Sequence, residues 1–381
     1  MRTSSWVVSQ KLTAPVPCWT GAFFLPERRQ EVHHHPGKEV KKMKKMILTV
    51  CSILALTLTA CGSGTSASAP VSSSEAQTET AKTYRVAVVK QLDHASLDEI
   101  ANAITAEFDA LSEKNGVIID YGQVYSGQND QTTLQQIASQ ALSDHADAII
   151  PIATLAAQTM TSAASDTKTP VIFAAISDPE AAELTGIDYV SGTSDALNTK
   201  VIMDMILSAG KDVKTVGLLY SKSEANSEKP IAEAKAYLKE KGIAFVEANG
   251  NTNDEVIQAA SSLIGQKVDA VFTPTDNVIM AAELAIAPLF QEAKIPHYAG
   301  ADSFVRNGAF ATCGVNYTEL GKRTADIAFD ALTKGVGTLE DYYLMDGGIV
   351  TVNTETASAL GIDFSSFRTF GEVVEVTTTE E

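Results

Sequence analysis

Several aspartates of this chain stand where an ammonium group could be bound. Asp178, Asp276 and Asp302 each follow closely on a short run of β-branched or aromatic residues. Carboxylates in such loops attract a cation, whereas a phosphate, sulfate or dicarboxylate would call for arginine forks, and Lys222 and Arg306 are the main cations nearby. Each aspartate alone is equally well a turn former or a helix cap. Their joint placement favours a site for a positively charged group.

Helix starts near Thr154 and Asn277 supply the other half of such a site. The free N–H groups of a first helical turn can bind a carboxylate. A zwitterionic amino acid would satisfy both halves. The candidate ligand-binding residues in these loops are Asp93, His94, Thr154, Leu155, Ser177, Asp178, Asn226, Asp276, Asn277 and Asp302.

The elements that must position these loops begin at Tyr84. Short β-branched runs alternate with segments of helical period, which predicts βαβ units and a parallel sheet. A first series covers residues 84–176, and a second, over 215–300, repeats its order, with residues 147–154 matching 269–276. The predicted fold class is α/β, with two doubly wound, Rossmann-like lobes joined by a hinge.

The cleft between two such lobes is the predicted site, because ligands of open α/β sheets bind outside the carboxyl ends of the strands. We expect an N-terminal lobe of residues 84–195 plus 305–333 and a C-terminal lobe of residues 196–304 plus 334–372. The chain would cross between them near residues 192–194, near 302–308 and after a helix ending at Lys334, with a strand over 310–315 in the first lobe. Closure around a ligand would be a population shift.

An export signal is predicted ahead of this body. Lys44 and Lys45 precede an apolar core, too short for a spanning helix, that ends in Leu58-Thr59-Ala60-Cys61 before a Gly/Ser/Thr/Ala run. This ending resembles the lipobox of bacterial lipoproteins, in which the cysteine is acylated, for example with palmitate, and two chains anchor durably. The alternative is an ordinary cleaved signal with a chance cysteine. We expect a mis-called leader over residues 1–42, a lipoprotein signal peptide over 43–60 and a flexible, lipid-anchored linker over 61–83.

The composition of the mature chain limits its partners. Without residues 1–60 it keeps 20 Lys and Arg and 44 Asp and Glu, a formal net charge of −24 against −18 for the whole sequence. This balance repels nucleic acids and anionic lipid headgroups. Cys18 and Cys51 leave with the leader and Cys61 is acylated, so Cys313 has no disulfide partner and is expected to be a small buried hydrophobe. The expected location is the extracytoplasmic face of the cell membrane, through the lipid anchor.

Four motifs resemble the substrate-binding lipoproteins of a bacterial ABC importer family that includes tryptophan/tyrosine-type, aromatic amino-acid binding proteins. They are Ser177-Asp178-Pro179, Glu224-Ala225-Asn226-Ser227, Pro274-Thr275-Asp276-Asn277 and Asn316-Tyr317-Thr318-Glu319-Leu320-Gly321, and the resemblance spans residues 84–347. It implies the type I periplasmic-binding-protein fold and capture of a small, aromatic amino acid by a monomer. It also implies delivery to an ABC permease and its ATPase, and ligand contacts from Thr154, Asp178, Asn226, Asp276 and Asp302. One departure is Asp93-His94-Ala95-Ser96, which lacks the family's proline, so the first loop is less rigid.

Catalysis is not indicated. The sequence has no Gly-x-Ser-x-Gly elbow, no paired metal-ligand spacing and no Gly-rich phosphate loop, so we expect neither an enzyme nor a cofactor or metal. A sugar-responsive repressor would share the two lobes but needs a basic DNA-binding head. The open alternative is a lipid-anchored sensor that presents its ligand to a membrane receptor or kinase.

Overall fold

The computed structural model describes residues 81–209 and 212–379. The leader, the signal peptide, Cys61 and the linker up to residue 80 lie outside these ranges. Within them, no helix has both the length and the apolar character needed to cross a membrane.

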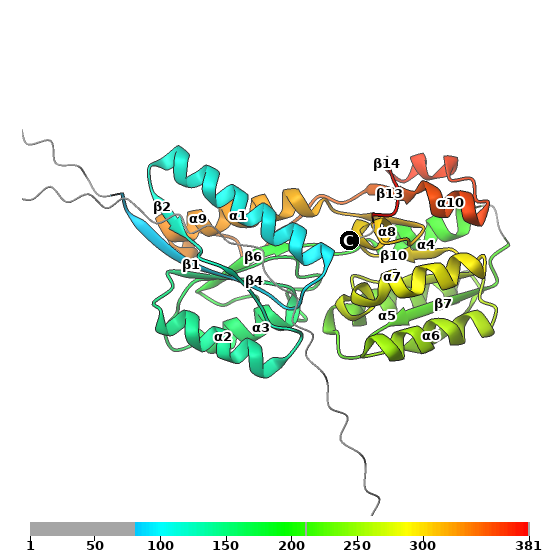
Figure 1. Cartoon of the computed structure of the whole chain (residues 1–381), viewed down its shortest axis with the longest axis horizontal. Coiled ribbons are helices and arrows are strands. Elements are labelled where there is room, and N and C mark those ends of the chain that lie inside the picture. Colours follow the sequence, from blue (N-terminus) through cyan, green and yellow to red (C-terminus); the bar gives the residue numbers. More distant parts are fainter. Residues whose placement is uncertain (1–80, 210–211, 380–381) are drawn as a thin grey trace, which may run out of the picture. The chain divides into compact units, whose positions relative to one another are not determined.

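The first lobe is built on a parallel sheet with the strand order β12-β6-β5-β4-β1-β2, in which β2 pairs with the first half of β1 and β3 with its second half. Figure 1 labels β1, β2, β4 and β6 of this sheet. Strand β4 reads Ala-Ile-Ile-Pro-Ile and is buried throughout, as expected for a parallel strand covered on both faces. Helices α1 and α9 pack together on one face, and α2 and α3 on the other. The bounds are β1 (Thr83–Lys90), α1 (Ala95–Asn115), β2 (Ile118–Asp120), β3 (Val124–Ser126), α2 (Gln131–Ser143), β4 (Ala148–Ile152), α3 (Thr154–Ala163), β5 (Val171–Phe173), β6 (Val190–Ser194), α9 (Tyr317–Lys334) and β12 (Tyr343–Leu344).

The second lobe has the strand order β14-β13-β11-β10-β9-β7-β8, and only the β11–β13 pair in this path is antiparallel. Helices α6 and α7 pack against each other, as do α4 and α5. The bounds are α4 (Thr199–Ser208), β7 (Thr215–Tyr220), η1 (Ala225–Ser227), α5 (Glu228–Glu240), β8 (Ala244–Asn249), α6 (Asn253–Gly265), β9 (Ala270–Thr273), α7 (Asn277–Glu292), β10 (His297–Ala299), α8 (Asp302–Arg306), β11 (Ala311–Gly314), β13 (Ile349–Asn353), α10 (Thr354–Leu360), η3 (Ser365–Thr369) and β14 (Glu372–Val376). The short helix η2 (Val336–Thr338) follows α9 in the first lobe.

The internal repeat predicted from the sequence has a structural counterpart. Asp147, just before β4, accepts a hydrogen bond from the backbone N–H of Arg85 at 2.8 Å. Asp269, just before β9, accepts hydrogen bonds from the backbone N–H groups of Lys214 and Thr215, both at 2.8 Å. Asp147 and Asp269 therefore hold equivalent positions: each connects two neighbouring strands, β1 and β4 in the first lobe and β7 and β9 in the second. The predicted α/β class with two parallel-sheet lobes is confirmed.

The hinge differs from the expectation. The strand expected over 310–315 in the first lobe is β11, and it pairs with β10 and β13 in the second sheet. The chain does not leave this lobe near residues 302–308 because α8 ends in a tight reversal, in which Ala309 donates to the carbonyl of Phe304 at 2.9 Å. The second crossing instead lies between Gly314 and Tyr317. The third lies between Leu344 and Ile349, because β12 still pairs with β6 of the first sheet.

Residues 117–124, which read as one β-branched run in the sequence, are divided between two short strands, β2 and β3. The turn between them contains a hydrogen bond from the backbone N–H of Gly122 to Asp120 at 3.2 Å. Gly122 has a φ of 56°, a conformation that favours glycine. Elsewhere, Cys313 is 2% exposed, as expected.

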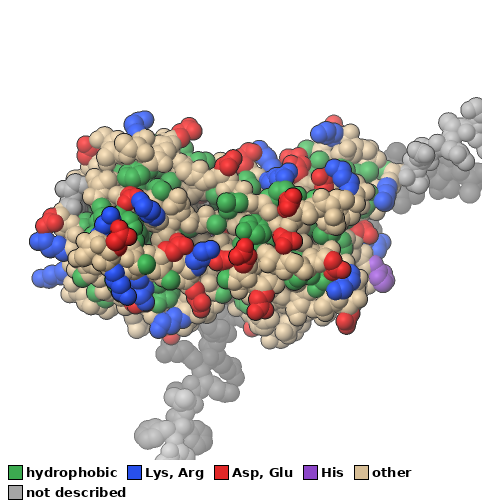
Figure 2. All heavy atoms as spheres, turned by 180° about the vertical axis from the view of Figure 1, so that it is seen from behind, with side chains coloured by type: hydrophobic (Ala, Val, Ile, Leu, Met, Phe, Trp, Pro, Cys, Tyr) green, Lys and Arg blue, Asp and Glu red, His purple; other side chains and the backbone are tan. Residues whose placement is uncertain are grey.

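The two lobes share apolar packing. One continuous cluster of buried side chains extends from α1 and α9 of the first lobe to α6 and α7 of the second. On the outer face seen in Figure 2, acidic and basic side chains are interspersed.

Candidate functional site

A small cavity lies where the carboxyl ends of the two sets of strands meet. The first lobe contributes the start of α1 and the ends of β4 and β5 to its wall. The second lobe contributes α8 and the loops before α5 and α7, and two crossings of the hinge complete the wall. Its volume is about 20 Å³. That is room for roughly one water molecule and far below the ~300–1,000 Å³ of ligand pockets. The lobes are therefore closed on each other.

The loop between β1 and α1 makes two of the contacts that close the lobes. Gln91 donates from Nε2 to Oε1 of Glu224 at 2.8 Å, and Nε2 of His94 lies 3.0 Å from Oδ1 of Asn277. Asn277 in turn donates from Nδ2 to Oε2 of Glu224 at 2.5 Å. Two residues of the first lobe thus hold a hydrogen-bonded pair of the second.

Three further polar contacts join the lobes. The Ser177 and Thr275 hydroxyl oxygens lie 2.9 Å apart, and Lys229 pairs with Asp178 at 2.9 Å. The hydroxyl groups of Ser96 and Ser303 are also hydrogen bonded. Closure is therefore supported by contacts on several sides of the cavity.

Burial perturbs two titratable groups of this closure network in opposite directions. Glu224 is 3% exposed, and burial together with the charge of Asp276 raises the pKa of its carboxyl to about 7. Burial lowers the pKa of the His94 imidazole to about 4. Neutral His94 then donates from Nε2 to Asn277, and its buried Nδ1 has no partner in the described part of the chain.

Asp276 lines the cavity, but all acceptor positions of its carboxylate are occupied by hydrogen bonds within the second lobe. Oδ1 accepts from the backbone N–H groups of Val278 and Ile279 at 3.1 and 3.0 Å, which makes Asp276 the N-cap of α7. Oδ2 accepts from the N–H of Ser221 and the hydroxyl of Ser227, both at 2.7 Å. These four hydrogen bonds leave no lone pair for a ligand ammonium group.

The start of α3 is the part of the wall best suited to a carboxylate. Thr154 lines the cavity and is 5% exposed, and the N-cap residue, Ala153, has no side chain that could cap the helix. The preceding Ala153 has a φ of 75°, an unfavourable conformation for a residue with a Cβ atom. The N–H of Leu155 donates to Oε1 of Gln91 at 2.9 Å. The first turn of α3 therefore presents donors to this side of the cleft.

The structure divides the ten predicted site residues into two groups. His94, Thr154, Ser177, Asn226, Asp276 and Asn277 all line the cavity, and Asn226 donates to the Thr275 carbonyl at 2.7 Å. The other four lie outside its wall. Asp93 pairs with Lys90, Asp178 with Lys229 and Asp302 with Arg306, while Leu155 faces Gln91 with its N–H.

Several wall residues were not among those candidates. Leu97, Met280 and Phe304 supply buried apolar surface. Asp195 and Tyr317, one at each of two hinge crossings, supply polar groups. Tyr317 lies within a motif that the sequence had singled out, as does Glu224, which joins the lobes without lining the cavity. Asp195 directly follows a strand, which is the signal that could have identified it.

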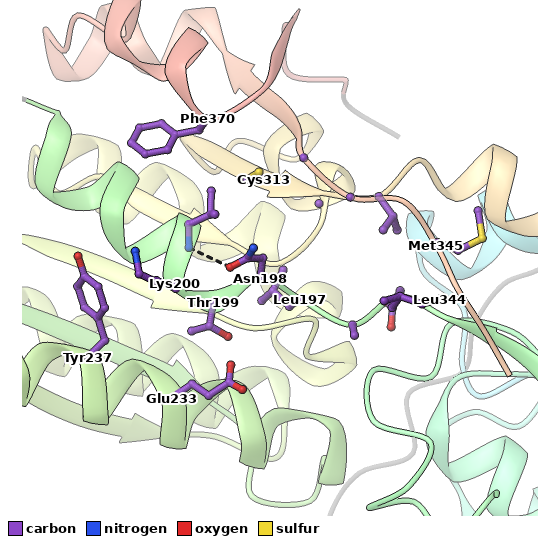
Figure 3. Close-up of a pocket in the computed structure, with 17 residues that line it drawn as sticks. Leu197, Asn198, Thr199, Lys200, Glu233, Tyr237, Cys313, Leu344, Met345 and Phe370 are labelled. Carbon is purple, nitrogen blue, oxygen red and sulfur yellow. Dashed lines mark hydrogen bonds between the residues drawn. The ribbon is translucent and has the colours of Figure 1, made fainter. Parts of the chain in front are cut away.

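A larger groove of about 680 Å³ lies on the hinge itself (Figure 3). Leu344 at the end of β12 and Met345 in the third crossing border it, and Glu233 and Tyr237 face it from α5. Asp195 lines both this groove and the cavity. In the described ranges, no group of three or more His, Cys, Asp or Glu side chains is placed to hold a metal ion.

Comparison with known proteins places this geometry in a family. The chain is 31% identical over 330 residues to a tyrosine-binding protein of Clostridioides difficile (strain R20291), covering 84% of this chain and 93% of that protein. A Streptococcus pneumoniae ABC domain in complex with L-Trp is 28% identical, with a TM-score of 0.69 over 77% of this chain and 100% of that one. A ligand-free, open substrate-binding protein with adhesive properties from Clostridium difficile is 31% identical, with a TM-score of 0.57 over 78% of this chain and 100% of that one.

These structural neighbours have the type I periplasmic-binding-protein fold, as the motifs implied. The family model described as ABC transporter substrate binding protein matches residues 85–366. The resemblance inferred from the sequence is thereby confirmed, and the function of this family is to bind substrate, not to catalyse a reaction. The chain belongs to the family of ABC transporter substrate-binding proteins.

Proposed function

We propose that this protein captures an aromatic amino acid between its lobes and delivers it to the permease of an ABC importer from a lipid anchor on the extracytoplasmic face of the membrane. The observation that carries the proposal is the composition of the cavity wall. The start of α3, where the neutral amide of Gln91 accepts from the Leu155 N–H, offers backbone donors for a carboxylate, and buried apolar side chains lie across the same cavity.

The apolar wall favours a large, flat side chain. Phe304 is 1% exposed, Met280 3% and Leu97 3%, and the ring of Tyr317 adds aromatic surface. Aromatic rings and the sulfur of methionine make favourable contacts with aromatic ligands. The relatives that bind tyrosine and L-Trp support the same ligand class.

Binding requires the lobes to open. A cavity of about 20 Å³ cannot admit an amino acid, so the ligand must enter an open state and then be enclosed. The TM-score of 0.69 to the complex with L-Trp, against 0.57 to the ligand-free open structure, supports a closed conformation here.

Ligand capture is tested by calorimetry and thermal shift with the mature chain carrying Cys61→Ser, screened against the twenty amino acids, several sugars and several purines. We expect one-to-one binding of tyrosine or tryptophan. Stabilisation by a sugar or a purine alone would refute the amino-acid proposal.

Anchoring and delivery are tested separately in cells. Cys61→Ser should release the protein from the membrane fraction and abolish palmitate labelling, while ligand affinity of the purified protein is unchanged. Deleting the protein should lower uptake of the radiolabelled amino acid. Normal uptake combined with loss of a transcriptional response would instead support the sensor.

A further inference from the structure

Asp195 holds an unusual position in this fold. It directly follows β6 and begins the first crossing between the lobes. It is 4% exposed and lines both the ligand cavity and the hinge groove. A carboxylate at this position can therefore contact a bound ligand while it also lies in the hinge.

The contacts of Asp195 leave its charge uncompensated. Oδ1 accepts a hydrogen bond from the Ser177 hydroxyl at 2.9 Å, and Oδ2 accepts one from the Tyr317 hydroxyl at 3.0 Å. Burial raises the pKa of Tyr317 well above its ordinary value, so this hydroxyl keeps its proton and donates. Both partners are neutral, and no Lys, Arg or His of the described chain forms an ion pair with Asp195. A carboxylate has about four acceptor sites, and the two hydroxyls and the backbone N–H of Asp195 itself take up to three of them, so about one or more stays open.

The other acidic groups around the cleft differ in this respect. Asp276 is fully used as a helix cap, and Glu224 is held by the amides of Gln91 and Asn277. Asp178 and Asp302 already pair with cations. Buried carboxylates normally have a cationic partner, because an unpaired buried charge is strongly unfavourable.

We infer that Asp195 receives the α-ammonium group of the ligand and thereby restricts the ligands of this protein to primary-amine zwitterions. The inference rests on the proposed function and names the group that selects the ligand class. The ammonium group supplies the missing positive charge and donors for the open acceptor sites. The start of α3, on the first lobe, takes the ligand carboxylate.

The partners of Asp195 connect this recognition to closure. Ser177, which donates to Asp195, also contacts Thr275 of the second lobe. Tyr317 is the first residue of α9, directly after the second crossing. An ammonium group on Asp195 therefore stabilises a network that includes one contact across the cleft and the ends of two crossings. Closure and selection of the ammonium group become one event.

The test compares Asp195→Asn with the wild type on two matched ligand pairs. The pairs are L-tyrosine with 3-(4-hydroxyphenyl)propanoate, and L-tryptophan with indole-3-propanoate, which lack only the ammonium group. Calorimetry on the wild type should show strong preference for the amino acids. In Asp195→Asn this preference should shrink at least about 30-fold, the lower end for breaking a buried charge pair. Affinity for the propanoates should stay the same or rise.

Folding of the variant is checked in the same experiment. Asparagine can accept from one hydroxyl and donate to the other, and it removes a buried charge, so the Tm without ligand should be unchanged or higher. If Asp195→Asn does not fold, Asp195→Ser is used with the same criterion.

Glu224→Gln is the matched control, because Glu224 is also a buried carboxylate but lies outside the cavity wall. Glu224→Gln should lower the affinity for the amino acid and for the matching propanoate by the same factor. An undiminished preference in Asp195→Asn overturns the assignment of Asp195 and leaves the proposed function intact. Failure of the wild type to bind any amino acid overturns both.

Discussion

Replacing Glu224 with glutamine should expose a pH dependence that the wild type conceals. The pKa of the His94 imidazole falls from 6.5 to about 4 in the folded protein, and that of the Glu224 carboxyl rises from 4.5 to about 7. Both groups belong to one hydrogen-bonded chain through Asn277. Between about pH 4.5 and 6.5, folding therefore removes a proton from one group and adds one to the other.

The signs of the two contributions to the free energy of unfolding are opposite. Glu224 has a raised pKa, so its contribution is fully present below pH 4.5 and is lost as pH rises through about 7. His94 has a lowered pKa, so its contribution is present above pH 6.5 and is lost as pH falls through about 4. At about 1.4 kcal/mol per pH unit, each is worth on the order of 3 kcal/mol. The contribution of His94 to the free energy of unfolding is smaller than that of Glu224, because His94 is partly exposed to solvent.

The assay is urea unfolding of the ligand-free protein at intervals between pH 4.5 and 7.5. Relative to the wild type, Glu224→Gln should lose about 2–3 kcal/mol of unfolding free energy as pH falls through this range, because only the His94 contribution is left. His94→Gln should show the reverse slope. The nearby charges of Asp93, Asp98 and Lys90 are common to all variants, so they cancel in the differences. Asp276 raises the pKa of Glu224, so its interaction with that carboxyl is part of what Glu224→Gln removes. Parallel curves for the wild type and Glu224→Gln would refute the reasoning.

Three further substitutions test other parts of the structure. Asp276→Ala should lower the free energy of unfolding by about 2 kcal/mol or more, since it removes the cap of α7 and leaves buried donors unpaired; unchanged urea unfolding would contradict this. Gly321→Ala should destabilise by about 1–3 kcal/mol because its Cβ would lie 2.6 Å from that of Ala103 where α1 and α9 meet, and a Tm equal to the wild type would count against such close packing. Asp178→Asn should change ligand affinity less than about fivefold in calorimetry, because its partner Lys229 is 58% exposed; a larger loss would make this ion pair a principal closure contact.

The fold was predictable because its signals are local. Buried parallel strands such as β4 read as short apolar runs, and the helices between them show their period directly. The place of β11 was not predictable in this way. Ala311, Thr312 and Cys313 would suit a strand of either lobe, and only the reversal after α8 assigns them to the second.

The sequence predicted which loops form the site, but not which hydrogen bonds their side chains make. The strand-end rule placed Thr154, Ser177 and Asp276 at the cavity, as the structure shows. Sequence could not reveal that the lone pairs of Asp276 are filled by its own helix and by Ser221 and Ser227. Nor could it show that the side-chain partners of Asp195 within residues 81–209 and 212–379 are the hydroxyls of Ser177 and Tyr317, which come from other elements of the fold.

The contacts of Gln91 in the closed conformation give a physical reason why an amino acid can compete for this cleft. The Gln91 side chain places its carbonyl oxygen on the Leu155 N–H at the start of α3 and its amide nitrogen on the Glu224 carboxylate of the other lobe. This is the polarity of a zwitterion, with an acceptor at a helix start and a donor at a carboxylate. A neutral amide satisfies both ends more weakly than full charges do, because charge-assisted hydrogen bonds are roughly twice as strong as neutral ones. On the proposed function, the ligand carboxylate takes over the start of α3 and the ammonium group takes the carboxylate of Asp195. Both of these groups lie on the first lobe, and Asp195 is linked to the second lobe through Ser177, whose hydroxyl oxygen lies 2.9 Å from that of Thr275. Ligand binding then shifts the population toward closure by the amount that it stabilises this contact in the closed state over the open state.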